Sequence, residues 1–177
     1  MPDQKFSFKA SGLWWLWITV VVAVLDQATK LWIIASVEYS ASIPVLPVFN
    51  ITHVHNPGAA FSFLSEAGGW QRWFFTIITI AVSGFLLWML KNMPRSNKLL
   101  GSAYTLILGG ALGNLYDRVS YGYVEDFIHV FYQNSHFPAF NIADSAITIG
   151  AALLIYDAFT NNEGTKEDKK EELSDDK

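Results

Sequence analysis

Four long apolar segments constrain this chain more than any other feature of its sequence. They cover about 13–34, 70–90, 99–116 and 140–159. Each falls within the roughly 17–25 residues that a helix needs to cross the hydrocarbon core of a bilayer. We therefore predict an all-α membrane protein with four transmembrane helices, which form a single domain over residues 1–160.

The distribution of charge favours the same class. Charged residues make up 16% of the chain, against about 25% in an ordinary soluble domain. Eleven of the 28 charges lie in residues 161–177, so the rest of the chain has too few to cover a water-exposed surface. We expect residues 161–177 to be a disordered cytoplasmic tail. Because the remainder carries no basic excess, we expect no nucleic-acid partner.

Basic residues predict the orientation. Two lysines precede the first span, and Lys91, Arg95 and Lys98 fill the short link between the second and third spans. Residues 35–69 contain neither Lys nor Arg. Since cytoplasmic loops are enriched in these residues, both termini are expected in the cytoplasm and the two longer loops outside.

The first of these longer loops shows a strand pattern. Pro44 to His55 alternates loosely between apolar and polar residues, which is typical of a half-buried strand. We predict a small extracytoplasmic β element between the first and second helices.

Polar residues from five separate stretches are expected at one level of the membrane. They come from the outer half of the first span, the two outer loops, the end of the third span and the start of the fourth. Charged groups inside a membrane are costly and usually functional. The set is Asp26, Lys30, Asn56, Asn114, Asp117, Arg118, Asp126, Asn141 and Asp144.

Several of these features also have a purely structural interpretation. Asp26 and Lys30 lie one helical turn apart and share a face, so they could simply form a buried ion pair that orients helices. Gly109 and Gly113 form a Gly-x-x-x-Gly pattern, which favours close helix packing over any chemistry.

A metal site is not expected. His53 and His55 are two residues apart and would share one side of a strand, but no third ligand is evident in the sequence, and a metal site needs more than two. The chain has no cysteine, which excludes thiolate ligands, disulfides and a thiol nucleophile. We expect neither a metal nor a cofactor.

The chemistry favours Asp126 and Asp144. Two carboxylates at a partly dry site cannot both ionise easily, so one retains a proton while the other acts as a base. Such a pair can activate water and protonate a leaving amine. The sequence contains neither His-Glu-x-x-His nor Gly-x-Ser-x-Gly, the usual signs of a zinc peptidase or a serine hydrolase.

Five motifs together resemble the lipoprotein signal peptidases, the type II signal peptidases of bacteria. The resemblance implies that Asp126 and Asp144 form a catalytic dyad, and that the other polar motif residues, with Gly58, support the site or bind substrate. The motifs are Asp26–Lys30, Asn56–Phe61, Gly113–Arg118, Val124–Phe127 and Phe140–Ser145.

The resemblance also implies an activity and its partners. The chain would be an intramembrane aspartyl endopeptidase that removes the signal peptide from diacylglyceryl-modified prolipoproteins, cleaving before the lipidated cysteine. It would work as a monomer among the lipids of the bacterial cytoplasmic (inner) membrane, with its site near the outer face. Two alternatives stay open: a small proton-coupled membrane carrier, and a scaffold whose ion pairs only hold the helices together.

Adjacent acids in the second outer loop need separate roles. Successive side chains of an extended segment point to opposite faces, so either Glu125 or Asp126 can meet Asp144. Asp126 is expected to do so, and Glu125 is expected to be solvated or to make a contact at the rim of the site.

Overall fold

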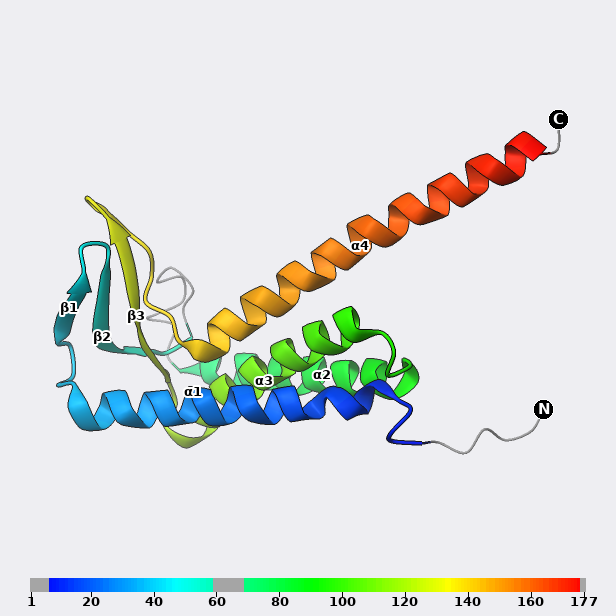
Figure 1. Cartoon of the computed structure of the whole chain (residues 1–177). Coiled ribbons are helices and arrows are strands. Elements are labelled where there is room, and N and C mark those ends of the chain that lie inside the picture. Colours follow the sequence, from blue (N-terminus) through cyan, green and yellow to red (C-terminus); the bar gives the residue numbers. More distant parts are fainter. Residues whose placement is uncertain (1–6, 59–68, 176–177) are drawn as a thin grey trace.

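Four long helices dominate the structure (Figure 1), a computed structural model that describes residues 7–58 and 69–175, with side chains described as far as Thr160. A 3₁₀ turn, η1, precedes the first helix. The helices begin and end within a few residues of the predicted spans, except that the third runs four residues further and the fourth continues well beyond its span. Their bounds are η1 Gly12–Trp15, α1 Leu16–Ser36, α2 Trp70–Asn92, α3 Lys98–Ser120 and α4 Ile142–Asp175.

All four helices contain a stretch long and apolar enough to cross a membrane, and in α4 that stretch ends at Thr160. The backbone of α4 continues as a helix to Asp175. The disorder expected for residues 161–177 stays a prediction.

α3 is the central helix and packs against α1, α2 and α4. Its glycines permit this close packing. A Cβ added to Gly109 would meet Val22 of α1 at 2.8 Å, and one added to Gly110 would overlap the carbonyl oxygen of Ala143 in α4. The packing interpretation of the Gly-x-x-x-Gly pattern is therefore confirmed for Gly109.

A four-stranded antiparallel sheet accompanies the helices, with strand order β1-β2-β3-β4. The predicted β element between the first two helices is present as β1 and β2, but it is only half of the sheet. The other two strands lie between α3 and α4. The pairing of β2 with β3 was not predicted, because it joins residues about 70 positions apart in the sequence. The bounds are β1 Ser42–Leu46, β2 Phe49–Asn56, β3 Val124–Tyr132 and β4 Ser135–His136.

The sheet lies at one end of the helices (Figure 1), where α1 and α3 end and α4 begins, while η1 and the link between α2 and α3 lie at the other end. Phe127 of β3 packs with Ile33 and Val37 at the end of α1, in a small buried cluster. The central pair of strands is in register with Val54 opposite Asp126. This packing fixes the position of Asp126 relative to the helix ends.

Candidate active site

The N-terminus of α4 is capped by two of the predicted site residues. The Asn141 side chain accepts a hydrogen bond from the backbone N–H of Asp144 at 2.9 Å, and the Asp144 carboxylate accepts one from the backbone N–H of Asn141 at 3.3 Å. This reciprocal arrangement is a capping box, which satisfies N–H groups that the first helical turn leaves unpaired. It holds the Asp144 carboxylate at the positive end of the helix dipole, where negative charge is favoured.

Asp126 is brought to the same place by β3. Its carboxylate accepts hydrogen bonds from the side-chain amides of Asn141 at 2.7 Å and Asn56 at 3.0 Å. Asn141 therefore contacts both acids. Burial, followed by the charge of Asp144, raises the pKa of Asp126 to about 7, and the two amides partly oppose this rise. Burial and the nearby charge of Asp144 therefore favour the protonated form of Asp126.

Asn114 links the acids to a buried ionic network. Its amide donates to Asp144 at 2.7 Å, and its oxygen accepts from the ammonium of Lys30 at 2.9 Å. Lys30 also pairs with Asp26 at 2.8 Å and with Asp117 at 2.7 Å. Lys30, Asp26 and Asp117 are all at most 1% exposed. The predicted pairing of Asp26 with Lys30 is present, and Asp117 joins it as a second carboxylate.

The network reaches both acid-bearing elements. Asp26 accepts a hydrogen bond from the backbone N–H of Ala143 in the first turn of α4, at 2.9 Å. Asp117 accepts one from the backbone N–H of Glu125 in β3, at 3.3 Å. The ion pairs therefore have the structural role of orienting helices, and they also position Asp126 and Asp144.

Gln27 is a supporting residue that the sequence analysis missed, although it lies inside a quoted motif. Its amide donates to Asp117 at 2.8 Å and to the carbonyl of Gly113 at 3.2 Å. Its place next to Asp26, in a span with few polar residues, was the available signal.

A cavity of about 620 Å³ opens beside the acids, between α2 and the first turns of α4. Asp144 and Asn56 line it, and Asp126 lies behind Asn56, from whose amide it accepts a hydrogen bond. The remaining wall is mainly apolar. It includes Phe75 of α2, Phe137 to Phe140 ahead of α4, and Ile149 of α4.

Arg118 supplies the positive charge of this cavity. Its guanidinium lies over the ring of Phe75 at 5.4 Å from the ring centre, and it donates to the carbonyl of Asn114 at 3.4 Å. The Nε atom is buried and makes no hydrogen bond within the described part of the chain. Arg118 therefore has donor capacity left for a bound group.

Gly58 shapes the loop that carries Asn56. Its backbone N–H donates to the Asn56 side-chain oxygen at 3.0 Å, and its φ of +109° lies in a region that favours glycine. A Cβ there would press on the Phe75 ring at 3.0 Å. The following motif residues, Ala59, Ala60 and Phe61, lie outside the described residues.

Glu125 differs from its expected role. It is 3% exposed, and its carboxylate lies 3.2 Å from His53 and 3.3 Å from His55. The expectation of a solvated or rim position is wrong, because β3 pairs with β2 and the Glu125 side chain lies against the two histidines of β2. The ten residues that were predicted for the site, which do not include Glu125, all lie at the sheet end of the helices.

Four candidate membrane spans, with two carboxylates beside a largely apolar cavity, define a membrane protein whose site suits acid–base chemistry. Comparison with known proteins identifies the family. The family model described as signal peptidase II matches residues 18–160, so the chain belongs to the signal peptidase II family.

Individual relatives agree. The lipoprotein signal peptidase of Pseudoalteromonas translucida is 62% identical over 159 residues, which are 90% of this chain and 95% of the relative. That of Alteromonas mediterranea is 56% identical and covers 91% of this chain and 88% of the relative. A bacterial membrane enzyme solved by the in meso method at 2.3 Å resolution has a TM-score of 0.76 and 38% identity, covering 85% of this chain and 90% of that one.

Proposed function

We propose that Asp126 and Asp144 are the catalytic carboxylates with which this signal peptidase II removes the signal peptide from prolipoproteins. The observation that carries the proposal is the position of Asn141 between the two acids. Its side chain donates to the Asp126 carboxylate, and its backbone N–H donates to the Asp144 carboxylate. The substrate is a prolipoprotein with a diacylglyceryl-modified cysteine, cleaved on the amino side of that cysteine.

The reaction needs only water and the two acids. The ionised carboxyl group takes a proton from water as the water oxygen attacks the scissile carbonyl carbon. The protonated carboxyl group gives its proton to the leaving nitrogen, and the C–N bond breaks. The products are the carboxylate end of the signal peptide and the free amino group of the lipidated cysteine. A proton shared between neighbouring acids suits this exchange.

Arg118 is suited to stabilise the oxyanion of the tetrahedral intermediate. The amides of Asn56 and Asn114 already donate to Asp126 and Asp144, whereas the buried Arg118 Nε keeps an N–H without a partner among the described residues. A donor aimed at developing negative charge in a dry site is worth about 10²–10³ in rate.

The apolar wall of the cavity suits the rest of the substrate. A signal peptide is an apolar helix and a diacylglyceryl group is two hydrocarbon chains, so both would favour a wall built from Phe75, Phe137 and Ile149. The cavity opens between α2 and α4, a route from the side of the bilayer. We place it near the outer face because Lys91 at the end of α2 and Arg95 in the link to α3 lie at the far end of the helices, and basic residues mark the cytoplasmic side.

Two substitutions test the dyad. Asp126→Asn and Asp144→Asn should each lower cleavage of a lipid-modified precursor in detergent by at least about 10²-fold, because an amide cannot exchange the proton. Asp157→Asn, near the far end of the apolar stretch of α4, is the matched control and should keep activity. If either dyad variant is folded and cleaves like the control, the proposal is wrong.

The carrier alternative has less support. A proton path across the membrane needs polar residues toward the other end of the helices, where Leu86, Leu90, Tyr104 and Leu108 form an apolar core instead. A loss of cleavage in both the Asp126→Asn and the Asp144→Asn proteins would exclude the alternative of a scaffold without activity.

A further inference from the structure

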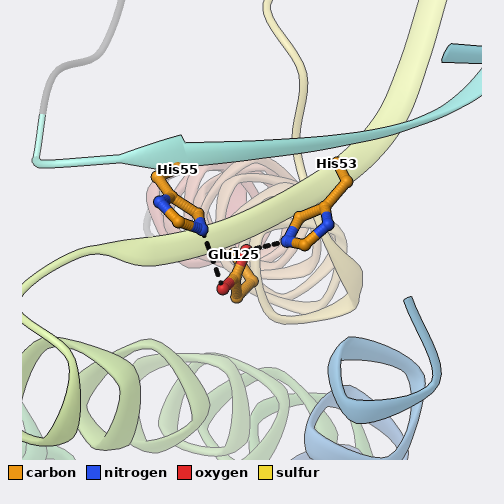
Figure 2. A group of neighbouring side chains, drawn as sticks. All are labelled: His53, His55 and Glu125. Atoms are coloured by element: carbon orange, nitrogen blue, oxygen red, sulfur yellow. Dashed lines mark ion pairs between the residues drawn. The ribbon is translucent and has the colours of Figure 1, made fainter. Parts of the chain in front are cut away.

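His53, His55 and Glu125 form a compact cluster on the sheet, separate from the hydrogen bonds that hold Asp126 and Asp144. The two histidines are two residues apart on β2, so their side chains share one face of the strand. Glu125 lies directly opposite His55 on β3. In Figure 2 the three side chains point toward one another. One nitrogen from each imidazole and one carboxylate oxygen all lie within 4.8 Å of one another.

One hydrogen bond determines which nitrogen of His53 carries a proton. Its Nδ1 lies 2.8 Å from the carbonyl oxygen of Val37 at the end of α1. A carbonyl oxygen can only accept, so Nδ1 is the donor and the neutral ring has its lone pair on Nε2. This is the arrangement seen in metal-binding histidines, whose second nitrogen donates to a carbonyl or carboxylate.

The lone pair of His53 then faces another acceptor. Nε2 lies 3.2 Å from Oε2 of Glu125, and both atoms are buried without a hydrogen-bond partner among the described residues. Two buried acceptors in contact are unfavourable unless a positive charge joins them. No Lys or Arg forms an ion pair with Glu125 in the described part of the chain. A second proton on His53 or a metal ion would supply the missing charge.

His55 supplies the second imidazole of the cluster, and its Nε2 lies 3.3 Å from Oε1 of Glu125. Aromatic rings hold it in place. Tyr123 stacks on it at 3.8 Å between ring centres, and Tyr39 lies 4.3 Å away.

We propose that His53, His55 and Glu125 bind a divalent metal ion of the zinc type, with water as a fourth ligand. Two imidazoles and one carboxylate are a ligand set that Zn²⁺ takes, at about 2.0–2.2 Å from each ligand atom. The ion would join β2 to β3 and, through His53, to the end of α1.

This metal is structural and takes no part in the proposed cleavage. Glu125 and Asp126 are neighbours on a strand, so their side chains point to opposite faces, and Asp126 faces Asn141 instead. Metal binding would hold β3, and with it Asp126, against the helix ends.

The four histidines of the chain provide a matched experiment. His129 and His136 stack on each other between β3 and β4, with ring centres 5.2 Å apart. We would purify the full chain in detergent with a tag that contains no histidine, remove metal with a chelator, and titrate Zn²⁺ and Co²⁺. The variants are His53→Gln/His55→Gln, Glu125→Gln and, as the control, His129→Gln/His136→Gln.

The wild-type protein and the control should bind one Zn²⁺ per chain and gain thermal stability with it. The His53→Gln/His55→Gln and Glu125→Gln proteins should bind at least about tenfold more weakly. Equal binding by the His53→Gln/His55→Gln protein, or no saturable binding by the wild type, would overturn the proposal and leave a protonated His53 paired with Glu125.

A variant that does not fold would not prevent the test. The visible absorption of Co²⁺ added to the wild-type protein distinguishes four-coordinate from six-coordinate ions. A four-coordinate spectrum that saturates at one equivalent supports the site, and the spectrum of hydrated Co²⁺ refutes it.

Discussion

Lys30 places a positive charge between two buried carboxylates, those of Asp26 and Asp117. Either carboxylate alone would be costly to bury, and together they also accept backbone N–H groups from α4 and β3. Removing one partner of a buried ion pair leaves an uncompensated charge. Lys30 therefore helps to position Asp126 and Asp144, although it forms ion pairs with neither of them.

The first prediction concerns this residue. Lys30→Met should lower the free energy of unfolding by about 3–5 kcal/mol, because two buried carboxylates lose their shared cation. Lys98→Met, at the exposed start of α3, is the matched control and should change it by less than about 0.5 kcal/mol. Thermal unfolding in detergent measures both. Equal unfolding temperatures for the two variants would contradict the assigned role.

At this scale the sequence predicted contacts within one helix better than contacts between elements. The pairing of Asp26 with Lys30 follows from their spacing of four residues. The contacts of Glu125 with His53 and His55 follow from strand pairing across about 70 residues, which the order of residues does not reveal. This is why Glu125 was expected at the rim and why the third possible metal ligand was missed.

Among the elements, α4 has the closest connection to the site. Its first turn is held by the Asn141–Asp144 capping box and lies against Gly110 of α3, where a Cβ would overlap the carbonyl of Ala143. The spacing of Asn141 and Asp144, three residues apart at the start of an apolar segment, is itself a sign of a helix start. The helix that carries Asp144 was thus predictable, but its tight contact with α3 was not.

Substituting Gly110 tests how closely α4 must approach α3. Gly110→Ala should destabilise the protein by about 1–3 kcal/mol, because the new methyl group forces the helices apart, and should lower cleavage by moving Asp144. Gly84→Ala is the matched control. Its Cβ meets nothing within 4 Å, so the change should be neutral or stabilise α2 by up to about 1 kcal/mol. Unfolding temperature and cleavage rate measure the two effects, and similar behaviour of both variants would contradict this packing argument.

For the molecule as a whole, the sheet lies at the end of the helices where α4 begins (Figure 1). Asp126 in β3 and Asp144 in the first turn of α4 lie at that same end. The number of helices and, apart from the end of α4, their approximate ends were predicted from apolar length alone. The full sheet was not, since two of its strands follow α3. The side of the membrane on which this end lies stays a prediction.

Single cysteines can test that orientation, since the chain has none of its own. Ser135→Cys, exposed in β4, should react with an impermeant maleimide on intact spheroplasts. Ser96→Cys, exposed in the link between α2 and α3, should react only after the membrane is opened. Reaction in the reverse order would place the sheet in the cytoplasm.

The central position of α3 also bears on how the chain enters the membrane. In its most apolar stretch 56% of residues are buried inside the protein, against 17–28% for the other three helices, and α3 is the least apolar of the four. Its small and polar residues are thus tolerated in the bilayer because neighbouring helices cover them. During synthesis, α1 and α2 emerge first and can receive α3, whereas α4 arrives only afterwards. Until α4 has been made, only α1 and α2 can cover the small and polar residues of α3.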